Sequence, residues 1–469
     1  MRVLNSRLWL VLIILVILSP LTLVPPVSAQ SESRSTWSRT FGQILGPDSI
    51  EVTSDGGFVV LVHENFGFGG RVMKANLAGD IEWDRYYIPP GYGDAHAYSI
   101  RQTKDRGFIV AGTALRPQGS FQTHAWLLKL DNDGGVQWSR IYRSGGFLWV
   151  EQTRDGGYIV AGMANGPDPS DGWVLKLDPE GNIVWQEMFR DQDISSVDQA
   201  DDGGFVVAGT VGVNSRADAW VFKLDAEGRM VWQRAFDAGL RTDAYSVQHT
   251  IDGGYIVTGE IAGVNTHGEG FSKALILKLD VKGNVEWQRL FDGGGTTHPF
   301  SVRQIPSQAF IVAGRFQPTF SPTFPFQRRG IIGPFLLKLD SKGDMIWQRV
   351  YGGLNDFLFD IQGTTDGATL VAGYLFETGS AWVLKLDDKG IIRGCPLGVP
   401  SNATLTDSAV LVADTTVTGI STSGTVNQTT VTITPTKGDL RTLCFSPSKA
   451  RDESVKEKRT QKGTKRIET

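Results

Sequence analysis

A tryptophan-centred repeat occurs seven times along the chain and constrains the fold more than any other feature. The repeat tryptophans follow one another at intervals of 46, 55, 47, 47, 55 and 60 residues. They are Trp37, Trp83, Trp138, Trp185, Trp232, Trp287 and Trp347. A period of this length is typical of proteins built from stacked supersecondary units, in which each unit buries its apolar faces against its neighbours.

Each repeat predicts four short strands, which we name a to d. In one copy, residues 153–162 read TRDGGYIVAG and residues 172–181 read GWVLKLDPEG, and Trp185 follows. The Asp-Gly-Gly turn joins strand a to the β-branched, apolar strand b. Strand c is the WVLKL segment, and an Asp-x-x-Gly turn leads to strand d with its tryptophan. Seven four-stranded antiparallel units predict an all-β, seven-bladed β-propeller, with a β-solenoid as the structural alternative.

The strand order also predicts how the ring closes. Trp37 precedes the first strand a, whereas no tryptophan follows the last strand c, which ends near Asp387. We therefore expect residues 37–41 to cross the ring and complete the blade built from residues 358–388. Closure by this N-terminal strand removes exposed sheet edges and ties the two ends of the propeller together.

The N-terminal segment has the pattern of a signal peptide. Arg2 and Arg7 supply a positive n-region ahead of an apolar run, and Val27-Ser28-Ala29 offers the small residues that a signal peptidase cleaves after. An uncleaved membrane anchor is the alternative. We expect a secreted or otherwise extracytoplasmic protein, at the cell surface or in the periplasm, with no membrane span in the mature chain.

Composition divides the chain into four predicted regions. They are a signal peptide at 1–29, the propeller at 30–394, a small Thr/Ser/Val-rich C-terminal β-appendage or extended stalk at 395–446, and a disordered charged tail at 447–469. The formal charge is 46 − 50 = −4, and such a mildly acidic chain has no polycationic surface for nucleic acid.

The C-terminal region carries the only two cysteines. In an exported chain, Cys395 and Cys444 predict a single disulfide, and two unpaired thiols in a reducing compartment are the alternative. Asn402 and Asn427 stand in Asn-x-Thr triplets and are possible glycosylation acceptors.

Variable loops are the predicted binding surface. The a–b and c–d turns are nearly constant in length and share one face, whereas the b–c and d–a loops vary and share the other. The sixth b–c loop, residues 315–333, includes Phe316 and suits protein or glycan contact through its aromatic and arginine side chains. The candidates there are Phe320, Phe324, Phe326, Arg328 and Arg329. The alternative is that these phenylalanines fold back over the blade as a plug.

Acidic residues and histidines gather in the d–a loops. The candidates are Asp94, His96, Asp191, Asp193, Asp237, Asp243, Asp292, His298 and Asp356. Ringing the channel mouth, they could bind a cation or hold a sugar, and capping of turns is the alternative. Residues 131–135, DNDGG, approximate a calcium loop and, with Trp138, a sialidase Asp-box, but they occupy the ordinary c–d turn. We therefore predict no catalytic residue and no metal site.

The c–d text, such as LDPEGNIVW at residues 177–185, resembles the quinoprotein-like (PQQ-like) propeller superfamily, whose tryptophan-docking repeat is A-x-D-x-x-T-G-K-x-x-W. Here the turn is one residue shorter and lacks the Thr and Lys. The full DGGYIVAG…WLLKLDxxGxxxW repeat is similar to exported bacterial and archaeal repeat proteins, over residues 37–395. This resemblance implies a propeller. It does not carry over a cofactor, because the chain lacks the eight blades and adjacent cysteines of the quinoprotein dehydrogenases; calcium and pyrroloquinoline quinone stay open.

Three functions follow as hypotheses. The first is a non-catalytic binding or scaffold module for a protein or glycan, acting through the b–c and d–a loops. The second is a secreted, glycosidase-like enzyme acting on polysaccharide, which requires two loop carboxylates about 5–10 Å apart. The third is a quinone-dependent oxidoreductase.

Overall fold

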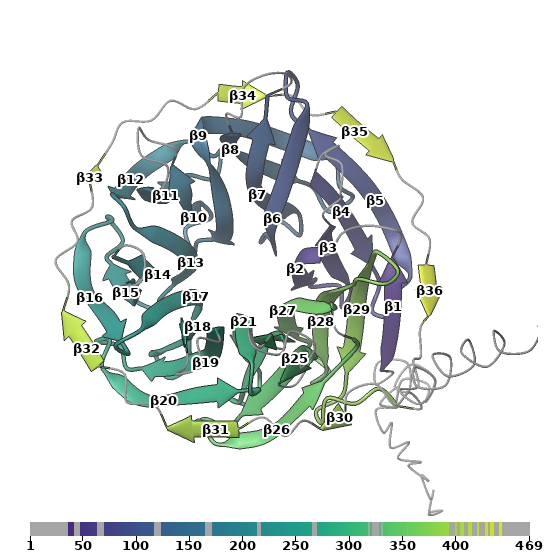
Figure 1. Ribbon diagram of the computed structural model, residues 1–469. Coiled ribbons are helices and arrows are strands. Elements are labelled where there is room, and N and C mark those ends of the chain that lie inside the picture. The colour runs from purple at the N-terminus through teal and green to yellow at the C-terminus, as the bar shows by residue number, and fades with distance from the viewer. Residues whose placement is uncertain are drawn as a thin grey trace, which may run out of the picture.

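The computed structural model forms a closed ring of seven blades around a central channel (Figure 1). It describes residues 36–442 except 42–46, 63–69, 117–122, 165–170, 213–216, 265–269, 318, 321–327, 330–331, 354, 394–398, 401–403, 408–410, 415–419, 422–426, 430–431 and 436–439. No helix in these described stretches is long and apolar enough to cross a membrane.

Each blade is a meander of four antiparallel strands, a to d from the channel outward, as the repeat predicts. Blade 1 contains β2 (Pro47–Val52), β3 (Phe58–Val62), β4 (Gly70–Ala75) and β5 (Ile81–Ile88). Blade 2 contains β6 (Asp94–Gln102), β7 (Phe108–Leu115), β8 (Thr123–Leu130) and the first part of β9 (Val136–Gln152). Blade 3 contains the second part of β9, then β10 (Tyr158–Ala164), β11 (Asp171–Leu177) and β12 (Ile183–Phe189).

The same order continues around the ring. Blade 4 contains β13 (Asp193–Gln199), β14 (Phe205–Val211), β15 (Asp218–Leu224) and β16 (Met230–Asp237). Blade 5 contains β17 (Arg241–His249), β18 (Tyr255–Val264), β19 (Gly270–Leu279) and β20 (Val285–Asp292). Blade 6 contains β21 (Thr296–Gln304), β22 (Phe310–Gln317), β25 (Gly333–Leu339) and β26 (Met345–Val350), with the small hairpin of β23 (Thr319–Phe320) and β24 (Arg328–Arg329) between β22 and β25.

Blade 7 closes the ring in the predicted way. It contains β27 (Phe357–Gly363), β28 (Thr369–Leu375), β29 (Ser380–Leu386) and, as its strand d, the N-terminal β1 (Trp37–Phe41). β1 pairs antiparallel with β29, from Trp37 opposite Lys385 to Phe41 opposite Ala381. The buried indole of Trp382 donates a hydrogen bond to Ser38 Oγ at 2.7 Å, which joins the two ends of the propeller across 344 residues of sequence.

The apolar core lies between blades. Seven clusters of buried side chains are found in the described chain, and each is shared by two adjacent blades. Val206 and Val221 of blade 4, for example, pack with Val257 and Leu275 of blade 5. One four-stranded sheet cannot cover both of its faces, so closure of the ring completes the core.

The repeat tryptophans join each blade to the next. The indole Nε1 of Trp185 in blade 3 donates to the carbonyl of Ala226, in the c–d turn of blade 4, at 2.9 Å. The same bond is made by Trp37, Trp83, Trp232, Trp287 and Trp347. The turn residue beneath the indole ring must be glycine for two reasons. At Gly228, φ is +85°, and a Cβ would lie only 2.9 Å from the Trp185 ring. The Trp and Asp-x-x-Gly elements of the repeat are therefore two halves of one contact.

Every strand a contains a β-bulge, which places an unpaired residue near the middle of the strand. The seven bulged residues are Asp48, Tyr98, Leu148, Ser195, Tyr245, Phe300 and Phe359. The bulge pushes a strand-a carbonyl toward strand b, where a Cβ on Gly112 would lie 2.0 Å from the carbonyl oxygen of His96. This contact explains the glycine that ends the Val-Ala-Gly text of strand b.

The C-terminal segment encircles the propeller as a belt (Figure 1, yellow strands). It adds one short antiparallel strand to the outer edge of strand d in every blade, in the order of blades 6, 5, 4, 3, 2, 1 and 7. Its strands are β30 (Val399–Pro400), β31 (Thr404–Asp407), β32 (Leu411–Asp414), β33 (Ile420–Ser421), β34 (Asn427–Thr429), β35 (Thr432–Pro435) and β36 (Leu440–Thr442). The composition predicted β-structure here, but not that it would cover all seven edges.

Candidate functional site

The channel is lined by strand-a positions whose residue type differs from blade to blade. Strand a of each blade contributes one residue to a ring, which we call the axial ring: Glu51, Arg101, Glu151, Asp198, Gln248, Arg303 and Gln362. Because side chains alternate along a strand, the residue two positions earlier lies on the same side. That second set is Ser49, Ser99, Trp149, Ser196, Ser246, Ser301 and Asp360, so only blades 3 and 7 depart from serine.

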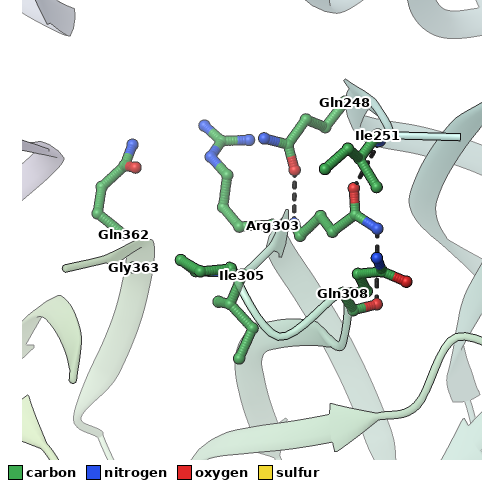
Figure 2. Close-up of a pocket in the computed structure, with 9 residues that line it drawn as sticks. Gln248, Ile251, Arg303, Ile305, Gln308, Gln362 and Gly363 are labelled. Atoms are coloured by element: carbon green, nitrogen blue, oxygen red, sulfur yellow. Dashed lines mark hydrogen bonds between the residues drawn. The ribbon is translucent and has the colours of Figure 1, made fainter. Parts of the chain in front are cut away.

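A cavity of about 170 Å³ lies inside the axial ring and is lined by residues from all seven blades. The ring lies toward the end of the channel that carries the a–b turns. The amides of Gln248 and Gln362 lie on either side of the Arg303 guanidinium (Figure 2). The cavity is therefore polar, and it combines carboxylates, amides and guanidinium groups.

Arg101 is the best-held cation of the cavity. Its side chain is 5% exposed; Nε donates to Glu151 Oε1 at 2.8 Å, and Nη1 donates to Ser49 Oγ at 3.2 Å and to its own neighbour's carbonyl, Ile100 O, at 2.7 Å. Nη2 is buried and has no hydrogen-bond partner. An unpaired buried donor is costly, so a ligand oxygen that reached Nη2 would satisfy a group that has no partner in the folded protein.

Trp149 replaces the small serine of the other blades and supports both arginines. The Cζ atoms of Arg101 and Arg303 lie 4.4 Å and 5.1 Å from its ring centroid, and its Nε1 donates to Glu151 Oε1 at 3.2 Å. Cation–π contacts hold the two guanidinium groups where mutual repulsion would otherwise move them apart.

Asp360 ties the channel wall together at the point of closure. Its Oδ2 accepts from Ser49 Oγ and the Ile50 amide of blade 1, both at 3.2 Å, and its Oδ1 accepts from Ser301 Oγ of blade 6 at 3.0 Å. A carboxylate in this position connects three blades, so we assign Asp360 a structural role.

Two other carboxyl groups of the ring are electrostatically perturbed. Loss of hydration in the channel raises the pKa of Glu51 to about 7, opposed by the charge of Arg101 and reinforced by Glu151. Burial, with the charge of Glu151, likewise raises the pKa of Asp198 to about 7. Near neutral pH these two carboxyl groups can therefore donate as well as accept hydrogen bonds.

The predicted d–a residues make local contacts. Asp94 Oδ2 lies 3.2 Å from His96 Nε2, Asp292 pairs with Lys273 at 3.0 Å, and His298 Nδ1 contacts Glu260 of the neighbouring blade.

The other d–a carboxylates include turn caps. Asp237 accepts from the Gly239 amide at 2.5 Å, Asp243 pairs with Arg241 at 2.7 Å, and the buried Asp356 accepts from the Gly353 and Phe376 amides. Asp191 adopts φ +55° in its turn, and Asp193 opens β13, where burial and the charge of Asp243 raise its pKa. Within the described chain, no group of three or more His, Cys, Asp or Glu residues could hold a metal ion.

The predicted b–c candidates are only partly within the described chain. Phe320 lies in β23, and Arg328 and Arg329 form β24, whereas Phe324 and Phe326 lie outside the described residues. Phe316 of the same insertion is fully buried and stacks on Phe335, with ring centroids 4.5 Å apart. That phenylalanine belongs to the core between blades 5 and 6 and not to an exposed loop.

Three of the C-terminal predictions also fall outside the described residues. Cys395, Cys444 and Asn402 lie there, so the disulfide stays a prediction. Asn427 lies in β34, where its backbone pairs with Ile141.

Sequence reasoning missed the axial ring because it looked for function in the loops. The signal was present one residue before the recurring Gln of strand a, as in Arg101-Gln102, Glu151-Gln152, Asp198-Gln199 and Arg303-Gln304. Unlike the turn and strand-b positions of the repeat, this position differs among the blades and is an acid, a base or an amide.

Comparisons with known proteins assign no family to this chain. No family model matches the sequence, and neither does any curated protein. Solved structures that are similar include a protein of unknown function from Dyadobacter fermentans, with 12% identity, a TM-score of 0.46, and coverage of 75% of this chain and 98% of that one. Sqt1 from Chaetomium thermophilum is 11% identical, with a TM-score of 0.45 and coverage of 75% of this chain and 99% of that one. Puromycin hydrolase is 13% identical, with a TM-score of 0.41 and coverage of 76% of this chain and 55% of that one. We draw no functional argument from likenesses this remote.

The fold and the site therefore define a seven-bladed β-propeller with a polar axial cavity.

Proposed function

We propose that the protein is a secreted, non-catalytic binding module that holds a protein or glycan ligand at the axial cavity. The observation that carries this proposal is the buried Arg101, which lines a polar cavity built from all seven blades and whose Nη2 has no hydrogen-bond partner. The predicted signal peptide supports an extracytoplasmic location, and the tryptophan docking supports an architectural relationship to the quinoprotein-like propellers.

Pre-organisation favours binding as the role of this site. Glu151 is fixed by both Arg101 and Trp149, and Gln362 Nε2 donates to Glu51 Oε2 at 3.1 Å. Side chains that are already held in place lose little entropy when a ligand arrives, so a rigid polar ring can bind with a modest number of contacts.

The test compares the wild-type protein with axial and loop variants. Biotinylated wild-type protein, Arg101→Met and Trp149→Ser are screened on a glycan array and by pull-down from the culture medium of the source cells. We expect the ligands captured by the wild type to be lost with both axial variants. Ligands that are kept by the axial variants but lost on combined alanine substitution of Phe320, Arg328 and Arg329 would move the site to the b–c loop and overturn the proposal.

A polysaccharide-acting enzyme is the second candidate, because two carboxyl groups approach the same guanidinium nitrogen. Glu51 Oε2 and Glu151 Oε1 lie 4.0 Å and 2.8 Å from Arg101 Nε, and the pKa of Glu51, about 7, suits a general acid. Release of reducing ends from a bound polysaccharide by the wild type, and its loss in Glu51→Gln with binding retained, would favour this candidate over the binding module.

A further inference from the structure

Two larger hollows adjoin the axial cavity on the face of the a–b turns. A hollow of about 480 Å³ shares Glu51, Arg101 and Glu151 with the axial cavity and extends over the a–b turn of blade 2. A second hollow, of about 330 Å³, shares Gln248, Arg303 and Gln362 with it and extends over the a–b turn of blade 6 (Figure 2).

Blades 2 and 6 lie nearly opposite each other in the ring of seven (Figure 1). Because each hollow shares three lining residues with the axial cavity, the three spaces lie next to one another in a row across the channel mouth. We call this row the axial trough. Its shape suits an extended chain and not a compact ligand confined to the channel.

The two ends of the axial trough carry the only two departures from a rule of the a–b turns. Five blades place a glycine with φ of +81° to +90° at the same turn position: Gly56, Gly156, Gly203, Gly253 and Gly367. Blade 2 places Arg106 there, with φ +67°, and blade 6 places Gln308, with φ +63°. Both line the trough, one at each end.

A non-glycine residue in this conformation costs roughly 1 kcal/mol, so its presence requires a compensating reason. The backbone at this position makes the same turn bond in all seven blades: the amide of Arg106 donates to Thr103 O, as the amide of Gly156 donates to Thr153 O. Compared with the glycine of the other five blades, Arg106 and Gln308 therefore differ only in having a side chain. Asp191 is the other non-glycine residue with positive φ in the described chain, and its d–a turn lies on the opposite face.

The chemistry of the lining favours hydroxyl groups as partners. Amide, carboxyl and guanidinium groups supply most of it, and neighbouring hydroxyls both donate to and accept from such planar groups. Ile251, 74% exposed, gives the blade 6 end an apolar surface for the C–H face of a sugar ring. A peptide ligand is instead usually anchored by side chains that fill deep, desolvated pockets.

We infer that the axial trough binds a linear oligosaccharide, which runs across the channel mouth with Arg106 and Gln308 contacting its two ends and Arg101 its centre. The inference rests on the proposed function and specifies its ligand class.

Chain length is the sharpest test. Glucose and β-1,4-linked gluco-oligosaccharides of increasing length, a galacturonic acid series of matched lengths, and a mixture of random hexapeptides are titrated into the full-length protein by calorimetry. We expect one of the sugar series to bind, with an affinity that rises with length until the trough is spanned. Arg106→Gly and Gln308→Gly should each weaken the longest bound sugar about tenfold, the effect of one lost charge-assisted or paired hydrogen bond, and leave the monosaccharide unaffected.

These variants separate binding from folding, because glycine restores the usual turn residue and relieves strain. Their melting temperatures should equal or exceed that of the wild type. Arg229→Ala, at an exposed arginine in the c–d turn of blade 4, is the matched control and should bind like the wild type.

Three results would overturn the inference. They are an affinity that does not depend on length, equal binding of long sugars by wild type and both glycine variants, and binding of the peptides in place of the sugars. The proposed function would survive the first two if Arg101→Met still abolished binding, and it fails only if that variant binds as the wild type does.

Discussion

The guanidinium of Arg101 lies over the indole of Trp149, with Cζ 4.4 Å from the ring centroid, and Arg303 approaches the same ring to 5.1 Å. Trp149 is the one aromatic member of a set that is serine in five blades. Trp149→Ser should therefore lower the free energy of unfolding by about 2 kcal/mol, because two partly desolvated cation–π contacts and the packing of the ring are lost. Chemical denaturation measures the change. Trp149→Phe should recover part of the loss, and equal stability of all three proteins would contradict the assignment.

The carboxyl groups of the axial ring should make stability depend on pH. The folded-state pKa values of Glu51 and Asp198 are about 7, above their ordinary values of 4.5 and 3.8, so the native state binds more protons than the unfolded state between these limits. Their effect is that stability falls as the pH rises from about 4 to about 7. Melting temperatures of wild type and the Glu51→Gln/Asp198→Asn double variant, measured from pH 5 to 8, should show a decline that is smaller in the variant. Parallel curves would contradict the prediction.

Acid should destabilise the a–b turns by the opposite route. Partial burial acts against it, but hydrogen bonds from Lys74 and Thr53 hold the pKa of Asp55 down to about 2, and Asp155 behaves in the same way with Thr153 and Lys176. The stability that these lowered values contribute is present above about pH 4 and is lost as the pH falls toward 2. Denaturation below pH 4 should therefore be steeper in wild type than in Asp55→Asn.

Blade 6 offers a way to add stability. In each of the other blades the buried lysine of strand c pairs with the turn aspartate, as Lys385 does with Asp366 at 3.0 Å. In blade 6 that position is Ser307, and burial lowers the pKa of Lys338, whose Nζ donates instead to Asp388 O at 3.1 Å. Ser307→Asp should stabilise the protein by about 0.5–1 kcal/mol and raise the pKa of Lys338. Ser307→Asn, which lacks the charge, is the control and should give the smaller gain.

The belt should protect the outer edges of the blades. Ending the chain after Arg393 removes all seven belt strands and leaves every strand d with unpaired backbone groups, which promote strand-to-strand association. We expect this truncated protein to have a larger mass by light scattering than the full-length chain. Ending the chain after Thr442 keeps the belt and should leave the mass unchanged; association in that protein too would assign the effect to the tail.

The chain contacts the N-terminal strand or the residue before it on both sides of the belt. The Arg393 amide donates to Thr36 Oγ1 at 2.6 Å, and Thr442 pairs with Arg39 of β1. Cys395 and Cys444 each stand two residues beyond these anchors in sequence, which supports the predicted disulfide. Reduction should then lower stability by about 4 kcal/mol, the scale expected for a loop of this length. Peptide mapping without reductant should recover the Cys395–Cys444 pair, and two free thiols would refute it.

The number of blades and the way the ring closes were predictable because both depend on short sequence motifs. The Asp-Gly-Gly turns, the Val-Ala-Gly strands and the Trp each have one physical role that recurs, and Trp37 before the first strand a determined the offset. The belt was not predictable in the same way. A Thr/Ser/Val-rich strand pairs through its backbone, which carries no information about which edge it joins.

The candidate site was predictable in its residues but not in its position. Arg101 and Glu151 are ordinary polar residues of an alternating strand, and only the ring brings them within 2.8 Å of each other. Trp149 could have been noticed as the bulky exception among serines, but its value depends on Arg303, 154 residues later, approaching the same ring.

The belt also sets a condition on how this protein can evolve. Its seven strands match seven blades one for one, from blade 6, where it starts, to the adjacent blade 7, where it ends. A repeat protein usually gains or loses units freely by duplication or deletion. Here a chain with six or eight blades would have a belt of the wrong length, so any change in repeat number needs a matching change in the belt at residues 399–442. The number of belt strands is therefore tied to the number of blades, and only a seven-bladed ring pairs every belt strand with an outer edge.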